Sequence, residues 1–183
     1  MKQIRNNIFE TNSSSTHSVS LTNMSSDIPN FEQLDSYVDQ ADHYIHIEFG
    51  EFGWGYDEYV DAYMKLQYLL TMIMELHRNE LITFDDFYNL DEFILVESIV
   101  TENVKDCKGI CIANDCFKRN SYDSEDKDGN PITKYWNSFN GYIDHQSYED
   151  YETLADFLDN WCVTIEDFIF NENVELIIDN DNH

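Results

Sequence analysis

A polar segment near the N-terminus holds the residue types best suited to bind an anion. Its hydroxyl, amide, imidazole and guanidinium groups belong to Arg5, Asn12, Ser13, Ser14, Ser15, Thr16 and His17. Donors of this kind, together with loop amides, bind phosphate groups in many proteins. The same side chains also stabilise compact turns by bonding to the nearby backbone. The sequence is therefore compatible with a phosphate-binding loop and with a purely structural turn.

The neighbouring serines and histidine are not enough for catalysis. A nucleophile needs a base aimed at it and a third group that orients the base, and proximity in the sequence supplies neither. We predict that the protein is not an enzyme and has no catalytic residues. The alternative is a small enzyme, or a nucleotide- or phosphate-binding protein, that uses this loop.

Two other segments resemble metal sites only in part. Asp126 and Asp128 match two positions of a calcium-binding loop that would begin at Ser124, but Tyr135 stands where a bidentate glutamate is expected. In an extended strand His43 and His46 point to opposite faces, and His46 can share a face either with Asp42 or with Glu48. The four cysteines lack the C-x-x-C spacing of zinc sites. We predict no metal and no cofactor.

The charge of the chain is extreme. Its 37 acidic and 10 basic residues give a net charge of -27, well beyond the magnitude of about 2 to 8 that favours solubility of a small domain. The same charge is carried by roughly 46 Å of duplex DNA, or about 13 base pairs. A surface that mimics DNA is one reading, and a halophilic or simply soluble acidic protein is the other.

The few basic residues are unevenly distributed. No Lys or Arg lies between Asn6 and Met64, or from Tyr135 to His183. The stripe of basic residues that is typical of nucleic-acid-binding proteins is absent. Direct DNA binding is expected to be weak and confined to the N-terminal polar segment. The two anionic stretches are the predicted partner-binding surfaces.

Three groups of carboxylates are the candidate contacts with a basic partner. The candidates are Asp35, Asp39, Asp42, Asp57, Glu58, Asp61, Glu149, Asp150, Glu152, Asp156 and Asp159. Tyr56, Tyr59 and Tyr63 accompany the second group, and such mixtures bind arginine-rich surfaces through ion pairs and cation–π contacts. The alternatives are that each group is a solvated face and that Tyr59 and Tyr63 pack under a helix.

The pattern of apolar residues predicts the elements that position these groups. Helices are expected over 31–40, 57–77, 83–104, 148–160 and 165–170, and strands over part of 1–10 and over 17–22, 44–49, 109–113, 132–136, 141–144 and 174–178. Residues 118–130 are expected to form a polar connection. The order lacks a βαβ rhythm and predicts one α+β domain over residues 1–183, with a small mixed or antiparallel sheet packed by about four helices.

Burial is predicted most clearly for the helix over 57–77. Its apolar residues cover most of the circumference, so the helix is expected to be central. In the helix over 83–104, the residues expected to face inward are Phe87, Phe93, Ile94 and Val100.

The N-terminal segment also carries a resemblance. Residues 5–18, which read RNNIFETNSSSTHS, resemble the opening of many proteins of bacteriophages and mobile elements of gut Firmicutes. With its small size and acidity, the chain resembles the phage-borne type II anti-CRISPR proteins, which inhibit Cas9. Members of this class do not share one fold, so the resemblance implies a target and no residue roles.

The resemblance and the charge together imply a function. We expect an inhibitor that binds a basic nucleic-acid-binding protein of a host defence system, namely Cas9 with its guide RNA, and blocks target-DNA binding or cleavage. Cas9 holds its heteroduplex in a positively charged channel and reads the flanking motif with arginines. A third hypothesis is a module that binds both DNA and a protein. No signal peptide and no long apolar run are evident, so the expected location is the cytoplasm of the bacterial host.

Overall fold

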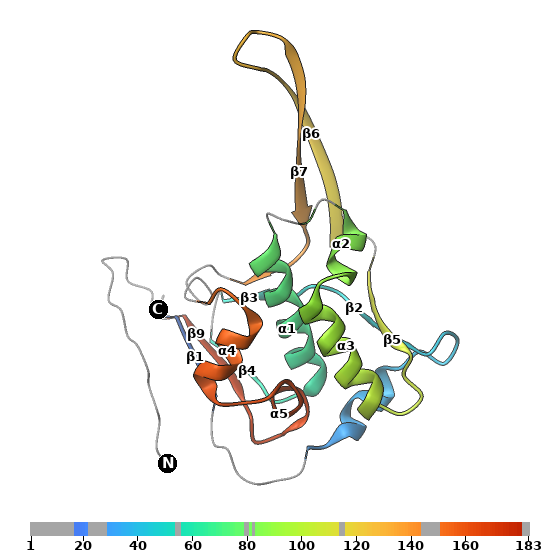
Figure 1. Cartoon of the computed structure of the whole chain (residues 1–183). Helices are drawn as coiled ribbons and strands as arrows, with labels where there is room; N and C mark the ends of the chain where they lie inside the picture. The colour runs from blue at the N-terminus through green and yellow to red at the C-terminus, as the bar shows by residue number, and fades with distance from the viewer. Residues whose placement is uncertain are drawn as a thin grey trace.

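Helices and small sheets alternate irregularly along the chain, and the fold is α+β as predicted (Figure 1). The computed structural model describes residues 17–21, 29–53, 56–78, 81, 83–113, 116–143 and 151–180. The predicted strand within residues 1–10 lies outside these ranges. The described residues form five α-helices, one 3₁₀ helix and four small sheets, where the sequence predicted about four helices and one sheet.

Helix α1 (Ala62–His77) is the centre of the fold. Leu66, Leu69 and Ile73 are fully buried, and the helix contacts η1, α3, α4, α5 and β8. The prediction of a central buried helix is confirmed, but its predicted start at Asp57 is wrong. Asp61 caps the helix, because its Oδ1 accepts hydrogen bonds from the backbone N–H groups of Tyr63 and Met64 at 2.9 and 3.2 Å.

The sheets are short, and some are antiparallel whereas others are parallel. In the antiparallel sheet, β9 (Leu176–Asn180) lies between β1 (His17–Leu21) and β4 (Asp57–Tyr59). Parallel pairs join β2 (Tyr44–Ile47) to β5 (Gly109–Ile112), and β3 (Glu51–Phe52) to β8 (Tyr142–Ile143). Residues 57–59 are therefore a strand, and pairing with a distant segment overrides their local helical pattern.

The remaining helices follow the predicted ranges with two larger differences, and the helix predicted over 31–40 is a 3₁₀ helix that ends at Tyr37. The first is that residues 83–104 form two helices, α2 (Phe84–Tyr88) and α3 (Asp91–Asn103), because Leu90 has extended backbone angles. The other helices are the 3₁₀ helix η1 (Phe31–Tyr37), α4 (Leu154–Trp161) and α5 (Ile165–Phe170). The second is that α4 begins after Thr153 rather than at residue 148.

One predicted core residue is exposed. Phe87, Phe93 and Val100 are buried as expected, whereas Ile94 is 49% exposed. The buried stripe of α3 consists of Phe93, Val96 and Val100. Ile94 lies about 100° around the helix from Phe93, and so falls outside this stripe.

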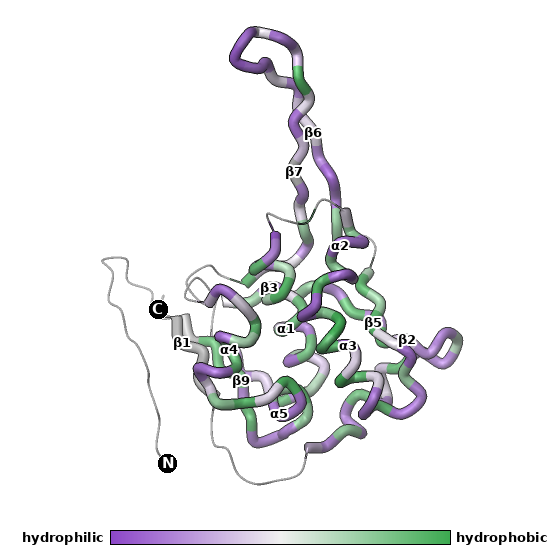
Figure 2. The backbone as a smooth tube through the Cα atoms, viewed as in Figure 1, coloured by the Kyte–Doolittle hydropathy of each residue, from purple (hydrophilic) through white to green (hydrophobic). Residues whose placement is uncertain are grey.

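Residues 117–139 form a long hairpin, where the sequence predicted a polar connection over 118–130 and a strand over 132–136. Strands β6 (Phe117–Glu125) and β7 (Pro131–Phe139) pair antiparallel over their whole length and project from the rest of the molecule (Figure 1). We call residues 117–139 the arm and the other described residues the body. Hydrophobic residues concentrate in the body, whereas hydrophilic residues line most of the outer half of the arm (Figure 2).

A single lysine is buried in the body. The Nζ of Lys65 donates hydrogen bonds to the carbonyl oxygens of Asn171 and Val174, at 2.9 and 3.0 Å, and the side chain has no exposed surface. Burial lowers the pKa of Lys65 to about 8, although Asp61 and Glu172 oppose this effect. The ammonium group thus ties α1 to the loop between α5 and β9.

This lysine generates a pH prediction. Its pKa is about 8 in the folded protein and about 10.4 in an unfolded chain, so the unfolded state binds more protons between these values. The contribution of Lys65 to the free energy of unfolding therefore rises with pH from 8 to 10. The stability difference between the wild type and Lys65→Met should change by about 2 kcal/mol in favour of the wild type over this window.

Denaturant unfolding at pH 8, 9 and 10 measures this difference. Lys108→Met, at an exposed lysine, is the control and should show no such trend. A pH-independent difference for Lys65→Met would contradict a depressed pKa at this position.

Candidate acidic interface

Strand β2 presents one exposed face of polar and aromatic residues. Ile45 and Ile47 are buried, and Tyr44 and His46 alternate with them on the outside. Glu48 follows in the same alternation and is exposed. A rigid strand therefore positions these outward side chains.

The turn before β2 is held by its own carboxylates. Asp42 Oδ1 accepts a hydrogen bond from the Tyr44 N–H at 3.0 Å, and Asp42 Oδ2 lies 2.9 Å from His46 Nε2. The Tyr44 N–H, followed by His46, lowers the pKa of Asp42. Asp39 accepts from the N–H of Ala41 at 2.6 Å. Asp42 and His46 are thus in contact, but Asp42 lies in the turn and not on a face of β2.

Aromatic rings lie beside these carboxylates. Tyr37 stacks on Tyr63 with ring centroids 4.3 Å apart and is 41% exposed. The Tyr63 hydroxyl donates to the carbonyl oxygen of His46 at 3.2 Å. We call the set Tyr37, Asp39, Asp42, Tyr44, His46 and Glu48 the η1–β2 surface. It combines fixed carboxylates with exposed tyrosines, which is the combination that binds arginine side chains.

Asp35 is engaged elsewhere. Its Oδ1 accepts a hydrogen bond from the backbone N–H of Lys105 at 3.1 Å, so it joins η1 to the segment after α3. Asp35 is half-buried. Its main contribution is therefore to hold these two segments together.

Strand β4 carries the second candidate group. Glu58 is exposed, and its contact with the like-charged Glu175 raises its pKa through a shared hydrogen bond and charge repulsion. Tyr56 donates to Glu58 Oε2 at 3.2 Å. Asp57 lies beside Tyr59, whose pKa is raised to about 12 mainly by burial. Two contacting carboxyls favour the approach of a cation.

The tyrosines of this group differ in their surroundings. Tyr59 is half-buried, with its ring centroid 5.6 Å from that of Phe52, and Tyr63 is also half-buried. These two tyrosines pack against the core, which is the structural alternative considered for them. Tyr56 is exposed.

The third group is only partly described. Glu149 and Asp150 lie outside the described residues. Asp156 forms a capping box with Thr153, in which each side chain accepts the other residue's N–H at 3.1 Å. Asp156 and the helix cap Asp61 therefore have structural roles. Glu152 and Asp159 are exposed.

The structure separates these groups in space. The segment that carries η1 and β2 lies on one side of the body, whereas β4, β9 and α4 lie on the other (Figure 1). The three sequence candidates are therefore not one continuous face. Glu48 and Glu175 belong to these surfaces but were not among the candidates. The alternation of residues 44–48 in the sequence indicates that Glu48 lies on the exposed face. No pattern in the sequence indicates the register of β9 with β4, on which the contact of Glu175 with Glu58 depends.

The N-terminal polar segment is outside the described residues, from Arg5 to Thr16. His17 begins β1, where its backbone pairs with Asn180. The phosphate-loop hypothesis stays a prediction.

The partial calcium motif forms the turn of the arm. Asp126 Oδ1 accepts the N–H groups of Asp128 and Asn130, both at 2.8 Å, and Oδ2 accepts the Asn130 side chain at 3.0 Å. These bonds, first among them that from the Asn130 side chain, lower the pKa of Asp126. Within the described ranges, no three His, Cys, Asp or Glu residues are grouped to hold a metal ion.

Most basic residues lie away from the acidic surfaces. Lys65 is buried, and Arg78 donates to Glu75 Oε1 at 2.7 Å and to the carbonyl oxygen of Gly141 at 3.4 Å. Lys105 and Lys108 precede β5, and Lys108 lies beside the η1–β2 surface, because its Nζ donates to the carbonyl oxygen of Asp42 at 3.5 Å. The other described basic residues belong to the arm and are Lys118, Arg119, Lys127 and Lys134. The body therefore exposes many acids and few bases.

Comparisons with protein-family models, with curated proteins and with solved structures each gave no match. Among the described helices, none combines the length and apolar composition needed to cross a membrane.

The contact between Glu58 and Glu175 generates a second prediction. A raised pKa of Glu58 means that its contribution to stability is lost as the pH rises through that pKa. Glu58→Gln should therefore raise the thermal midpoint at pH 7 relative to the wild type, and the difference should vanish near pH 3. Glu152→Gln, which changes the charge equally, is the control. A lower midpoint for Glu58→Gln at pH 7 would contradict repulsion at this contact.

Proposed function

We propose that this protein inhibits a nucleic-acid-targeting effector of bacterial defence, and that the effector is Cas9 loaded with guide RNA. The protein binds a basic surface of the effector stoichiometrically, within the bacterial cytoplasm, and prevents the binding or cleavage of target DNA. It acts by occupying a surface and not by catalysis.

The observation that carries the proposal is the arrangement of charge. The chain has a net charge of -27, and among the described basic residues only Lys105, Lys108 and the partly buried Arg78 lie at the body surface. A surface of this kind is attracted to clusters of lysine and arginine and repelled by nucleic acid. It therefore competes with nucleic acid for the same basic channel.

The η1–β2 surface is the proposed contact. The carboxylates of Asp39 and Asp42 are held in place by backbone N–H groups, so little entropy is lost when a cation binds them. Tyr37 and Tyr44 are exposed beside these carboxylates. Tyrosine and arginine contribute most strongly to protein interfaces, and an arginine side chain can contact both an acid and a ring here.

The basic nucleic-acid-binding surfaces of Cas9 support the choice of this effector as the target. Cas9 binds a heteroduplex in a positively charged channel and recognises the flanking motif with arginines. The N-terminal segment, residues 5–18, adds the resemblance to anti-CRISPR proteins.

A cleavage assay tests the proposal. Guide-loaded Cas9 is mixed with increasing amounts of the protein, either before or after target DNA is added. Inhibition should saturate near one equivalent and be weaker when DNA is added first. Raising the salt concentration should lower the potency, because salt screens the attraction between exposed charges on the two proteins. Unimpaired cleavage at a large excess of the protein would refute the Cas9 assignment.

Charge-neutralising variants test the contact surface. Asp42→Asn with Glu48→Gln should weaken inhibition at least tenfold, since both acids belong to the proposed contact. Glu152→Gln with Asp159→Asn removes the same charge from α4 and its approach, and should change the potency less than twofold. If the α4 pair has the larger effect, the contact lies on the other side of the body.

A further inference from the structure

The arm is anchored firmly to the body at its base. Phe117 and Phe139 lie with ring centroids 5.3 Å apart, and Phe117 stacks on Phe84 of α2 at 6.0 Å. The side-chain amide of Asn137 donates to the carbonyl oxygen of Leu81. Nine residues in each strand give the arm a length of about 30 Å. It is a fixed projection whose two faces are largely exposed.

The pairing register gives the two faces of the arm different chemistry. Residues that lie directly opposite one another share a face. Lys118 pairs with Ser138, Tyr122 with Lys134, and Ser124 with Ile132, so all of these residues and Asn120 lie on one face. This face has no acidic residue, and we call it the acid-free face. The opposite face carries Arg119 and Tyr135, together with Asp123 and Glu125.

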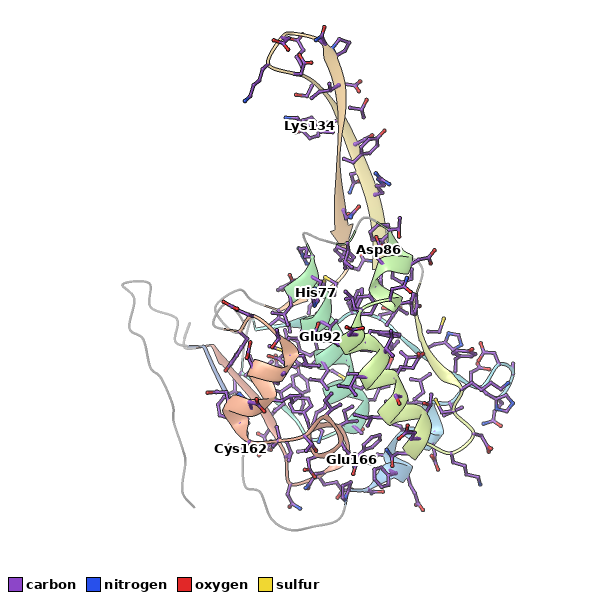
Figure 3. All side chains as sticks on the ribbon, viewed as in Figure 1. His77, Asp86, Glu92, Lys134, Cys162 and Glu166 are labelled. Atoms are coloured by element: carbon purple, nitrogen blue, oxygen red, sulfur yellow. The ribbon has the colours of Figure 1, made fainter. Side chains whose placement is uncertain are left out.

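Aromatic and cationic groups are paired on the acid-free face. The Nζ of Lys134, which lies midway along the arm (Figure 3), is 5.9 Å from the ring centroid of Tyr122. Tyr122 is 50% exposed. Asn120 donates to Ser138 Oγ at 2.9 Å and thereby braces the two strands on this face. The face thus offers two ammonium groups, a half-exposed aromatic ring and hydroxyl groups.

We infer that the acid-free face of the arm is a binding site for single-stranded nucleic acid, with Lys118 and Lys134 on phosphate groups and Tyr122 stacked on a base. Stacking on tyrosine accepts any base, because every base has an aromatic face. Lysine is depleted in protein interfaces and common on phosphate groups, so this face fits a nucleic acid better than a protein.

The projection of the arm makes this binding compatible with an acidic body. At physiological ionic strength the Debye length is about 8 Å, whereas Lys134 lies five residue pairs beyond Phe117. That separation corresponds to about 16 Å along a strand. The field of the body is therefore largely screened at Tyr122 and Lys134 in the middle of the arm, whereas Lys118 lies next to Phe117 at its base. The site differs from the N-terminal polar segment and does not depend on the identity of the effector.

Fluorescence anisotropy of the whole protein with a labelled single-stranded oligonucleotide, in RNA and DNA forms, tests this site. Lys118→Glu with Lys134→Glu should weaken binding at least tenfold. Lys105→Glu with Lys108→Glu makes the same change in net charge on the body and should weaken it less than twofold. Tyr122→Ala should weaken binding at least about fivefold, which is the smallest loss expected from stacking onto one base, and Tyr122→Phe should restore it.

Several results would overturn the inference. They are the absence of binding by the wild type, equal losses in the arm and body variants, or equally tight binding of a duplex of the same sequence, because duplex bases cannot stack on Tyr122. A loss of effector binding without any oligonucleotide binding would identify the arm as a protein contact instead. Lys118→Gln with Lys134→Gln is the second variant, and unchanged thermal midpoints show that the variants are folded.

Discussion

Repulsion among carboxylates is the main unfavourable interaction that this fold must offset. A net charge of -27 disfavours any compact state, so the fold uses its acids where a negative charge is stabilising. Asp61, Asp86 and Asp156 cap or brace the first turns of α1, α2 and α4. Carboxylates at these positions meet unpaired N–H groups and the positive end of the helix dipole.

Acidic side chains also link the helices to one another. Glu92 of α3 contacts His77 at the end of α1, and its second oxygen accepts the N–H of Leu154 at the start of α4 at 2.9 Å (Figure 3). Lys65 provides the opposite charge inside the body and binds two carbonyl oxygens. The acids that remain at the surface are therefore available to a basic partner, while most of the exposed bases among the described residues lie on the arm.

The sequence predicted elements well where local patterns decide them. Helix α5 has the predicted bounds, because the cap Thr164 is followed by a short apolar pattern. Strand β4 was missed because it forms only by pairing with β9, more than a hundred residues away. In the arm, the predicted strand over 132–136 lies within β7, whereas β6 was missed because the arm is exposed on both faces, so its residues show no apolar alternation. The contact of Asp42 with His46 followed from local spacing, whereas that of Glu58 with Glu175 depends on a sheet register.

Complex formation in the absence of DNA is the most direct measurement of the central claim, that an acidic surface occupies a basic channel. Isothermal titration of the protein into guide-loaded Cas9, with and without bound target DNA, should give one-to-one binding only to the DNA-free effector. The affinity should fall as salt is added. No heat of binding and no complex on gel filtration at micromolar concentrations would contradict the account.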